Sequence, residues 1–170
     1  MIILGVDPGL SLTGWGLIES TDKKSVSLID YGCIRTKPDR GLGERLKVIY
    51  QDLLNIIQSH KAEALALEEL FFSKEARTVA AVAQARGAVL LSAAVSGIPI
   101  FEYNPRHVKM AMTGYGSADK NQIQQMVKMF LKMSEIPKPD DAADALAIAI
   151  CHLNTAKFEN SVIINGRIEK

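Results

Sequence analysis

The sequence is poor in cysteine. It holds two, Cys33 and Cys151, and neither has a second cysteine or a histidine at the spacing of a zinc finger. This excludes a disulfide-stapled scaffold and a sequence-local zinc site. We expect both thiols to be small residues that are buried or half-buried.

Long apolar runs and an excess of charge of one sign are missing too. Stretches such as AVLLSAAV end at polar residues or glycine before the ~20 residues that span a bilayer, and the start MIILGVDPG lacks the basic residues of a secretory signal. We therefore expect a cytoplasmic protein without membrane contact. Because the net charge is only +1, binding to phosphates needs local clusters of lysine and arginine.

The composition is that of one globular domain. Of the 170 residues, 48% are hydrophobic and 23% charged, which is enough for a single core. Three β-prone segments with short turns between them, IILGVD, TGWGLIES and SVSLIDYGCIRT, predict an antiparallel meander. From Glu44 to His60 apolar residues recur at spacings of three and four, which predicts an amphipathic helix.

Strands and helices alternate in the rest of the chain. ALALEELFF and IPIFEYN are typical of strands, an Ala-rich helix covers roughly 75–96 and stops at Gly97, and Pro105 suits the first turn of a helix. Two further helices are expected in ADKNQIQQMVKMFLKM and DDAADALAIAICHLNTA. This order predicts a mixed α/β fold with a sheet covered by helices. The apolar stripe of the ADKNQ helix is interpreted as core: Ile123, Met126, Met129, Phe130 and Met133.

The last residues, 158–170, form a tail beyond a domain that spans 1–157. Within FENSVIINGRIEK, Asn165 and Gly166 stand between β-prone residues, which is a strong hairpin signal. An isolated hairpin is only marginally stable in water. A short hairpin and a disordered tail therefore both stay open.

Acidic residues stand at the ends of two apolar strands and at the start of the last helix. Asp7 ends IILGVD, and Glu68 and Glu69 end ALALEE. If these strands are central and parallel, their carboxyl ends lie side by side. Asp141 and Asp144 are three residues apart and share one face of the last helix. Three separate elements are thus expected to converge on one acidic cluster.

Such a cluster favours Mg²⁺ or Mn²⁺. Packed carboxylates repel one another unless cations lie between them, and an oxygen-only ligand set suits these ions better than zinc. Two such ions ~3.5 to 4 Å apart hold an attacking water and a leaving oxygen in line across a phosphodiester. The predicted chemistry is phosphodiester hydrolysis.

Each acid also has a simpler interpretation. Asp7 alone is typical of a turn residue, Glu69 of a solvated strand end, and Asp140 of a helix N-cap. Asp141 and Asp144 alone would favour the positive end of the helix dipole. The joint placement on two strand ends and one helix face is what favours a functional site.

The blocks that carry these acids resemble the RuvC family of bacterial Holliday-junction resolvases, in the RNase H-like superfamily. The resemblance runs from IILGVDPGLSLTGWG through ALEELFF, AQARGAV, YNPRHVK and GYGSADKNQIQQMV to PDDAADALAIAICH, and reaches about Ala156. It implies an RNase H-like fold with a five-stranded mixed sheet whose first three strands are antiparallel. It also implies a homodimer that makes symmetric nicks in four-way DNA junctions and leaves 5′-phosphate and 3′-hydroxyl ends.

The resemblance further implies a set of site residues. Asp7, Glu68, Asp141 and Asp144 match the family's four metal-binding, catalytic acids, although spacing alone also admits Asp140 with Asp144. They would hold two Mg²⁺ per active site, with Mn²⁺ as a substitute. Lys109 and Lys120 match family lysines near the bound phosphates, and Lys120 is expected to assist catalysis.

Other residues are expected to touch DNA or a partner chain. Phe71 stands where the family places an aromatic that stacks on unpaired bases. Lys74 and Arg77 are weaker candidates for DNA contacts, as are Arg86 and Arg106. Alanines of the Ala-rich helix, from Ala80 to Ala85, are expected either at the dimer surface or against the sheet. The resemblance also implies work beside the RuvA and RuvB branch-migration proteins.

Two other functions compete with nuclease activity. Actin-like ATPases bind phosphates at a related strand and turn, but they need two such domains, and GYGSADK lacks the spacing of a P-loop. A junction-binding protein without activity is the other alternative. The presence of acids at all four matching positions argues against it.

Overall fold

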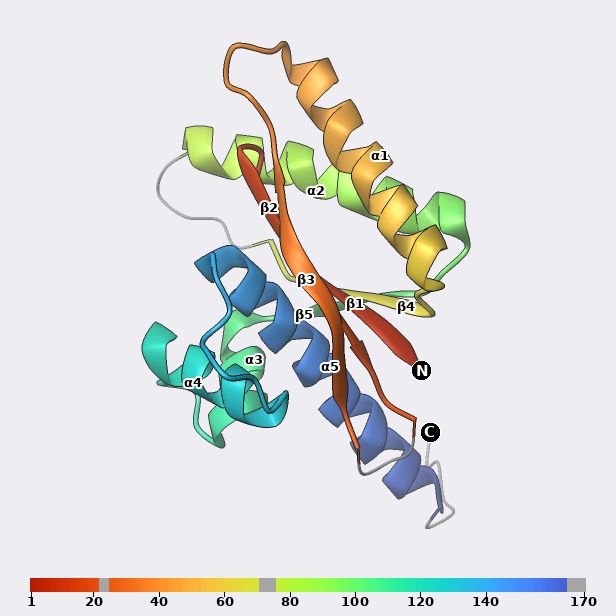
Figure 1. Ribbon diagram of the computed structural model, residues 1–170, viewed down its shortest axis with the longest axis vertical. Coiled ribbons are helices and arrows are strands. Elements are labelled where there is room, and N and C mark those ends of the chain that lie inside the picture. Colours follow the sequence, from red (N-terminus) through yellow and green to blue (C-terminus); the bar gives the residue numbers. More distant parts are fainter. Residues whose placement is uncertain (22–24, 71–75, 165–170) are drawn as a thin grey trace.

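The computed structural model describes residues 1–21, 25–70 and 76–164 and forms one sheet between two layers of helices (Figure 1). The strands are β1 (Ile2–Asp7), β2 (Leu12–Glu19), β3 (Ser27–Arg35), β4 (Ala64–Glu68) and β5 (Ile100–Tyr103). The helices are α1 (Leu42–His60), α2 (Ala76–Ser96), α3 (Pro105–Thr113), α4 (Lys120–Phe130) and α5 (Asp140–Ile164).

The sheet has the order β3-β2-β1-β4-β5. The first three strands pair antiparallel, and β1, β4 and β5 pair parallel. The predicted meander and the five-stranded mixed sheet are therefore confirmed. Parallel pairing places the carboxyl ends of β1 and β4 at the same edge of the sheet.

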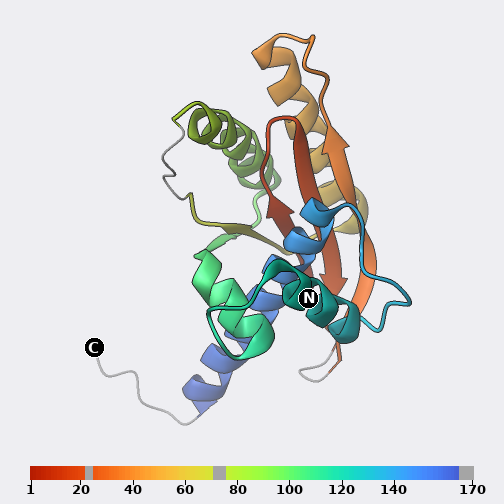
Figure 2. The ribbon, with the colours of Figure 1, turned by 90° about the vertical axis from the view of Figure 1, so that its left-hand side faces the viewer.

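The two faces of the sheet carry different cores (Figures 1 and 2). Leu4 and Val6 of β1 pack with α1 and α2, whereas Ile3 packs with α3, α4 and α5 on the other face. This alternation follows from the period of two along a strand. In α1, the helical spacing predicted from the sequence buries Ile49, Leu53 and Ile57.

Glycines in β1 and β2 let α5 lie directly on the sheet. Gly5 pairs with Gly16, and Gly14 lies two residues from Gly16 on the same face. A Cβ added to Gly5 would be 2.0 Å from the backbone oxygen of Ala145, and one added to Gly14 would be 2.0 Å from the backbone oxygen of Asp141. Glycine within a strand marks such close approaches. The first turns of α5 are therefore held against the ends of β1 and β2.

The helix α2 spans Ala76–Ser96, within one residue of the predicted Ala-rich helix. By length and mean hydropathy alone, its segment Val79–Ser96 could cross a membrane, although Gln84 and Arg86 interrupt the apolar residues there. A core helix of a folded domain passes the same test. Ala85 and Val89 are buried against the sheet and α1, and Arg86 forms an ion pair with Glu102. These contacts make α2 a helix of this domain.

Two local predictions differ from the structure. Ile123, Met126, Phe130 and Met133 pack in the core as predicted. Met129 is instead 68% exposed, and Val127, four residues after Ile123 on the same face, is buried. The helix α5 continues to Ile164. It therefore includes the residues before Asn165 that would form the first strand of the hairpin, and the structure does not agree with that alternative. Asn165 and Gly166 lie outside the described residues, and the domain boundary at 157 stays a prediction.

Candidate active site

Asp7 and Glu68 occupy neighbouring positions at one edge of the sheet. Val6 of β1 pairs with Leu67 of β4, so the next residue of each strand, Asp7 and Glu68, lie side by side. Asp7 is two residues from Gly5 and therefore faces α5. The β1–β2 turn that follows Asp7 is held by buried Thr13, whose Oγ1 donates to the backbone oxygen of Gly9 at 2.7 Å.

The start of α5 adds two carboxylates to this pair. Burial raises the pKa of Asp7 from 3.8 to about 7, and the nearby charges of Asp144, Glu68 and Asp141 contribute to this rise. Burial and the charge of Asp144 also raise the pKa of Glu68. Asp7, Glu68 and Asp144 line one cavity, so acids from β1, β4 and α5 converge, as the sequence predicts. We call Asp7, Glu68, Asp141 and Asp144 the carboxylate cluster.

Lys120 is placed beside the cluster by the start of α4. Asp119 caps this helix, since its side chain accepts from the backbone N–H of Gln122 at 2.9 Å and the Gln122 side chain accepts from the backbone N–H of Asp119 at 2.9 Å. Lys120 Nζ lies 3.2 Å from Asp144 and 3.3 Å from Asp140. Partial burial lowers the pKa of Lys120, but the contacts with the two aspartates outweigh this and raise it.

A second lysine faces the cluster from α3. The charge of Lys109 opposes the rise in the pKa of Glu68 that burial and Asp144 cause. One cavity of about 240 Å³ is lined by Lys109, Lys120, Asp7, Glu68 and Asp144. Both predicted lysines are thus at the site. The cavity combines carboxylates, which bind cations, with ammonium groups, which bind phosphates.

The donor set fits a hard divalent cation. Among the described residues, no three His, Cys, Asp or Glu side chains already lie close enough to hold a metal. The side chains of the cluster nevertheless offer only oxygen ligands, the set that Mg²⁺ and Mn²⁺ prefer. The mutual repulsion that raises the pKa of Asp7 is what a bound cation relieves. Lys120 supplies a positive charge to Asp144 in this structure.

Neighbouring acids have other roles. Asp140 is the first residue of α5 rather than its N-cap, and its carboxylate contacts Lys120. Glu69 is exposed, as expected for a solvated strand end. Phe71 and Lys74 lie outside the described residues, and Arg77 belongs to the first turn of α2 but its side chain lies outside the description.

Arg86 is not the surface contact that the sequence predicts. It is 8% exposed, its Nη1 donates to the backbone oxygen of Glu68, and its Nη2 lies 2.6 Å from the carboxylate of Glu102. A buried charge needs a partner. The sequence carries no local signal for this burial, because an arginine in a helix is usually exposed unless it is paired.

A buried histidine and the two cysteines lie in the packed interior or at its edge. His152 is buried, and its Nδ1 is 2.7 Å from the hydroxyl of Tyr103. Cys151 is buried and Cys33 is half-buried, as predicted. Ala85 is buried, so it cannot contribute to a dimer surface, whereas Ala80 is exposed.

Comparison with known proteins agrees with this site. The family model described as "Crossover junction endodeoxyribonuclease RuvC" matches residues 3–152. Proteins of that name from Endomicrobium trichonymphae and Desulforamulus reducens are 57% and 56% identical, over 93% and 89% of this chain and 83% and 93% of their own lengths.

A solved structure shows the same architecture. Thermus thermophilus RuvC in complex with a Holliday junction substrate is 34% identical and superposes with a TM-score of 0.89, over 94% of this chain and 96% of its own. The family match covers all four residues of the carboxylate cluster. The resemblance read from the motifs is confirmed, and this chain belongs to the RuvC family of crossover junction endodeoxyribonucleases.

Proposed function

We propose that this RuvC-family endodeoxyribonuclease cuts four-way DNA junctions with the carboxylate cluster. The observation that carries the proposal is the convergence of acids from β1, β4 and α5 with Lys109 and Lys120 in one cavity. A site of cation-binding and phosphate-binding groups at one edge of a sheet matches the chemistry of phosphodiester hydrolysis. The family membership supports the four-way junction as substrate.

Asp7, Glu68, Asp141 and Asp144 would hold two Mg²⁺ ions, with Mn²⁺ as a substitute. Bound there, these ions supply activation of the attacking water and stabilisation of the negative charge on the leaving 3′ oxygen. Asp7 ends the buried strand β1, which pairs with β4, and this pairing keeps its carboxylate fixed relative to Glu68. Fixed carboxylates reduce the reorganisation that binding and reaction require.

The lysines act on the phosphate. Lys109 and Lys120 line the cavity from α3 and α4, opposite the strand ends. Their ammonium groups would hold the non-bridging oxygens of the bound phosphate and offset the charge that develops there. Hydrolysis then leaves a 5′ phosphate and a 3′ hydroxyl.

The first experiment compares Glu68→Gln with Glu69→Gln. Both substitutions remove one carboxylate from the end of β4, but only Glu68 lines the cavity, while Glu69 is exposed. We expect wild type and Glu69→Gln to make paired nicks at symmetric positions of a labelled four-way junction in Mg²⁺, and none in chelator. Glu68→Gln should bind the junction without cutting it.

Other results would overturn parts of the proposal. Binding without nicks by wild type, in Mg²⁺ and in Mn²⁺ and with several junction sequences, would identify a binding protein. Nicking of linear duplex at the same rate would contradict the junction specificity. Loss of junction binding in Glu68→Gln would show that Glu68 supports the fold rather than the chemistry.

The partners are part of the proposal. Symmetric nicks need two active sites, so the proposed unit is a homodimer, and the exposed Leu91 and Val95 of α2 supply an apolar surface for it. Leu91→Glu should convert a dimer to a monomer in light scattering after size-exclusion chromatography. Phe71, Lys74 and Arg77 would contact the junction, and RuvA and RuvB would act beside the protein in the cytoplasm.

A further inference from the structure

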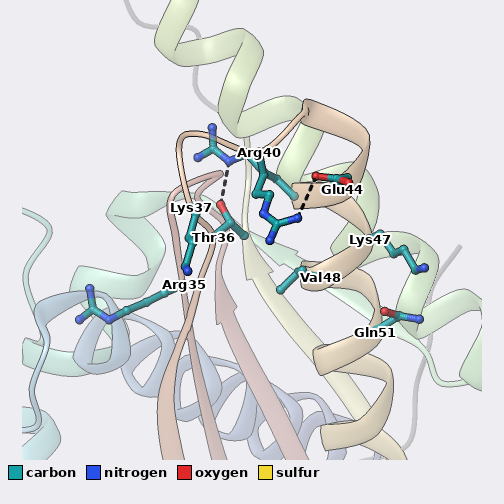
Figure 3. Close-up of a pocket in the computed structure, with 9 residues that line it drawn as sticks. Arg35, Thr36, Lys37, Arg40, Glu44, Lys47, Val48 and Gln51 are labelled. Carbon is teal, nitrogen blue, oxygen red and sulfur yellow. Dashed lines mark hydrogen bonds and ion pairs between the residues drawn. The ribbon is translucent and has the colours of Figure 1, made fainter.

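A second hollow of the surface lies at the β3–α1 connection, outside the carboxylate cluster (Figure 3). It has a volume of about 480 Å³. Five cationic side chains line it, and we call them the basic groove: Arg35, Lys37, Arg40, Arg45 and Lys47. Figure 3 shows Arg35 and Lys37 extending from the end of β3 and Lys47 from α1.

The basic groove is strongly positive, although the protein as a whole is almost neutral. The net charge of the protein is +1, yet Glu44 is the one acid that lines the groove among the described residues. Glu44 lies 3.7 Å from Arg40, and both side chains are more than 60% exposed. Exposed ion pairs of this kind are weak. Arg35, Lys37 and Lys47 are exposed as well, so the groove faces solvent with a strong excess of positive charge.

The groove is built on a rigid support. Thr36, which is 8% exposed, donates from Oγ1 to the backbone oxygen of Leu10. Arg45 donates from Nε to Thr36 Oγ1 and from Nη2 to Ser11 Oγ, both at 2.8 Å. These bonds tie the β3–α1 connection to the β1–β2 turn, which begins directly after Asp7. The groove and the carboxylate cluster therefore share one support.

The register of the sheet fixes the separation of the two sites. Asp7 pairs with Gly14, Gly14 pairs with Cys33, and Arg35 follows two residues later at the same edge. With strands about 4.8 Å apart and a rise of about 3.3 Å per residue, Arg35 lies roughly 12 Å from Asp7 along the sheet. This separation is similar to the ~12 Å width of the major groove of B-DNA.

We propose that the basic groove binds the phosphodiester backbone of a duplex arm of the junction, across a DNA groove from the phosphate that is cut. The inference rests on the proposed function, because it takes the scissile phosphate to lie at the carboxylate cluster. Arginine and lysine hold backbone phosphates and so fix the orientation of a duplex without reading its sequence. The groove orients the arm, and the cluster cuts it.

The test measures junction binding as a function of salt. The parent is full-length protein carrying Glu68→Gln, which should bind fluorescent junctions in Mg²⁺ without cutting them, and Arg35→Gln/Lys37→Gln is added to this background. We expect binding about tenfold weaker near physiological salt. A plot of log K against log salt should be shallower by about 0.9 for each phosphate that the variant no longer neutralises. Lys47→Gln, which changes a lysine of α1, should also weaken binding and make the salt plot shallower, but to a smaller extent.

Two control variants separate the groove from general charge. Glu44→Gln removes the acid of the groove and should strengthen binding. Lys128→Gln removes one positive charge from the last turn of α4, on the other side of the sheet, and should leave the salt dependence unchanged. Thermal melting of each variant checks that the fold is kept.

Arm length identifies what the groove touches. On junctions whose arms are cut to about half a helical turn, ~5 bp, the groove variants should bind as tightly as the Glu68→Gln parent. The proposal would be overturned if the groove variants lost the same affinity on short and long arms, or if their salt dependence on long arms were unchanged. The groove would then fit an acidic protein surface instead. These results leave the proposed function standing. The proposed function has its own test, because it would be contradicted only if the wild-type protein did not cut junctions.

Discussion

Arg86 in α2 donates a hydrogen bond from Nη1 to the backbone oxygen of Glu68, and so connects a helix on one face of the sheet to the end of β4. Its second amino group lies 2.6 Å from the carboxylate of Glu102 on β5. A planar guanidinium can hold both partners at once. Arg86 is therefore a positioning residue for Glu68.

Arg86→Met should weaken this positioning without touching the cavity. We expect cleavage about tenfold slower, in line with the removal of one hydrogen bond to a charged group, and a higher Mg²⁺ concentration at half-maximal rate. Junction cleavage across a Mg²⁺ titration measures both. Glu102→Gln, which removes only the exposed half of the ion pair, is the control, and an Arg86→Met enzyme with the wild-type Mg²⁺ midpoint would contradict the role.

Asp141 and Asp140 should differ sharply when each is changed to asparagine. The charge of Asp141 acts on Asp7, whereas the carboxylate of Asp140 contacts Lys120. Asp141→Asn should slow cleavage by about 100-fold or more, because cation binding contributes several kcal/mol to the transition state. Asp140→Asn should stay within about tenfold of wild type. Single-turnover rates on one junction compare the two, and a reversed order would move the metal ligand to Asp140.

Gly14→Ala tests whether the close approach of α5 builds the site. The new Cβ would lie 2.0 Å from the backbone oxygen of Asp141, so α5 must shift, at a cost of up to ~3 kcal/mol. A shift of about 1 Å can slow a positioned reaction about 100-fold. Urea unfolding and junction cleavage measure the two effects. Gly43→Ala in α1, where an added Cβ meets no atom within 4 Å, should preserve both.

The metal-free protein should lose stability as the pH rises from about 4 to about 7. The pKa of Asp7 is raised from 3.8 to about 7 by burial and by its acidic neighbours, so the folded state holds this proton more tightly than the unfolded chain. The stabilisation is fully present below the unfolded pKa and is lost as the pH rises through the folded pKa. For Asp7 it amounts to at most roughly 4 kcal/mol.

Asp7→Asn isolates this contribution. In chelator at pH 8 the variant should be more stable than wild type in urea unfolding, and the difference should shrink toward pH 5. Mg²⁺ at pH 8 should stabilise wild type more than the variant, because ligand binding to the folded state raises its stability. Parallel pH profiles for the two proteins would show that Asp7 is not held protonated by the fold.

The order of strands and helices could be read from the sequence because it depends on local patterns. The period of two in IILGVD, the three-to-four spacing from Glu44 to His60 and the stop at Gly97 are properties of neighbouring residues. The buried face of the ADKNQ helix was predicted correctly for Ile123, Met126, Phe130 and Met133, but the spacing of apolar residues did not decide every position at the edge of that face. Met129 was assigned to the core but is 68% exposed, whereas Val127, which the prediction left out, is buried.

The sequence by itself determined the family, the mixed sheet and the four acids, because these follow from ordered motifs and from where strands end. Only the tertiary structure decided how the acids meet. Contacts between distant segments, such as Gly14 with Asp141 and Arg86 with Glu68, have no local signal that names the partner. The same holds for the basic groove, whose cations come from a strand end, a connection and a helix that only the fold brings together.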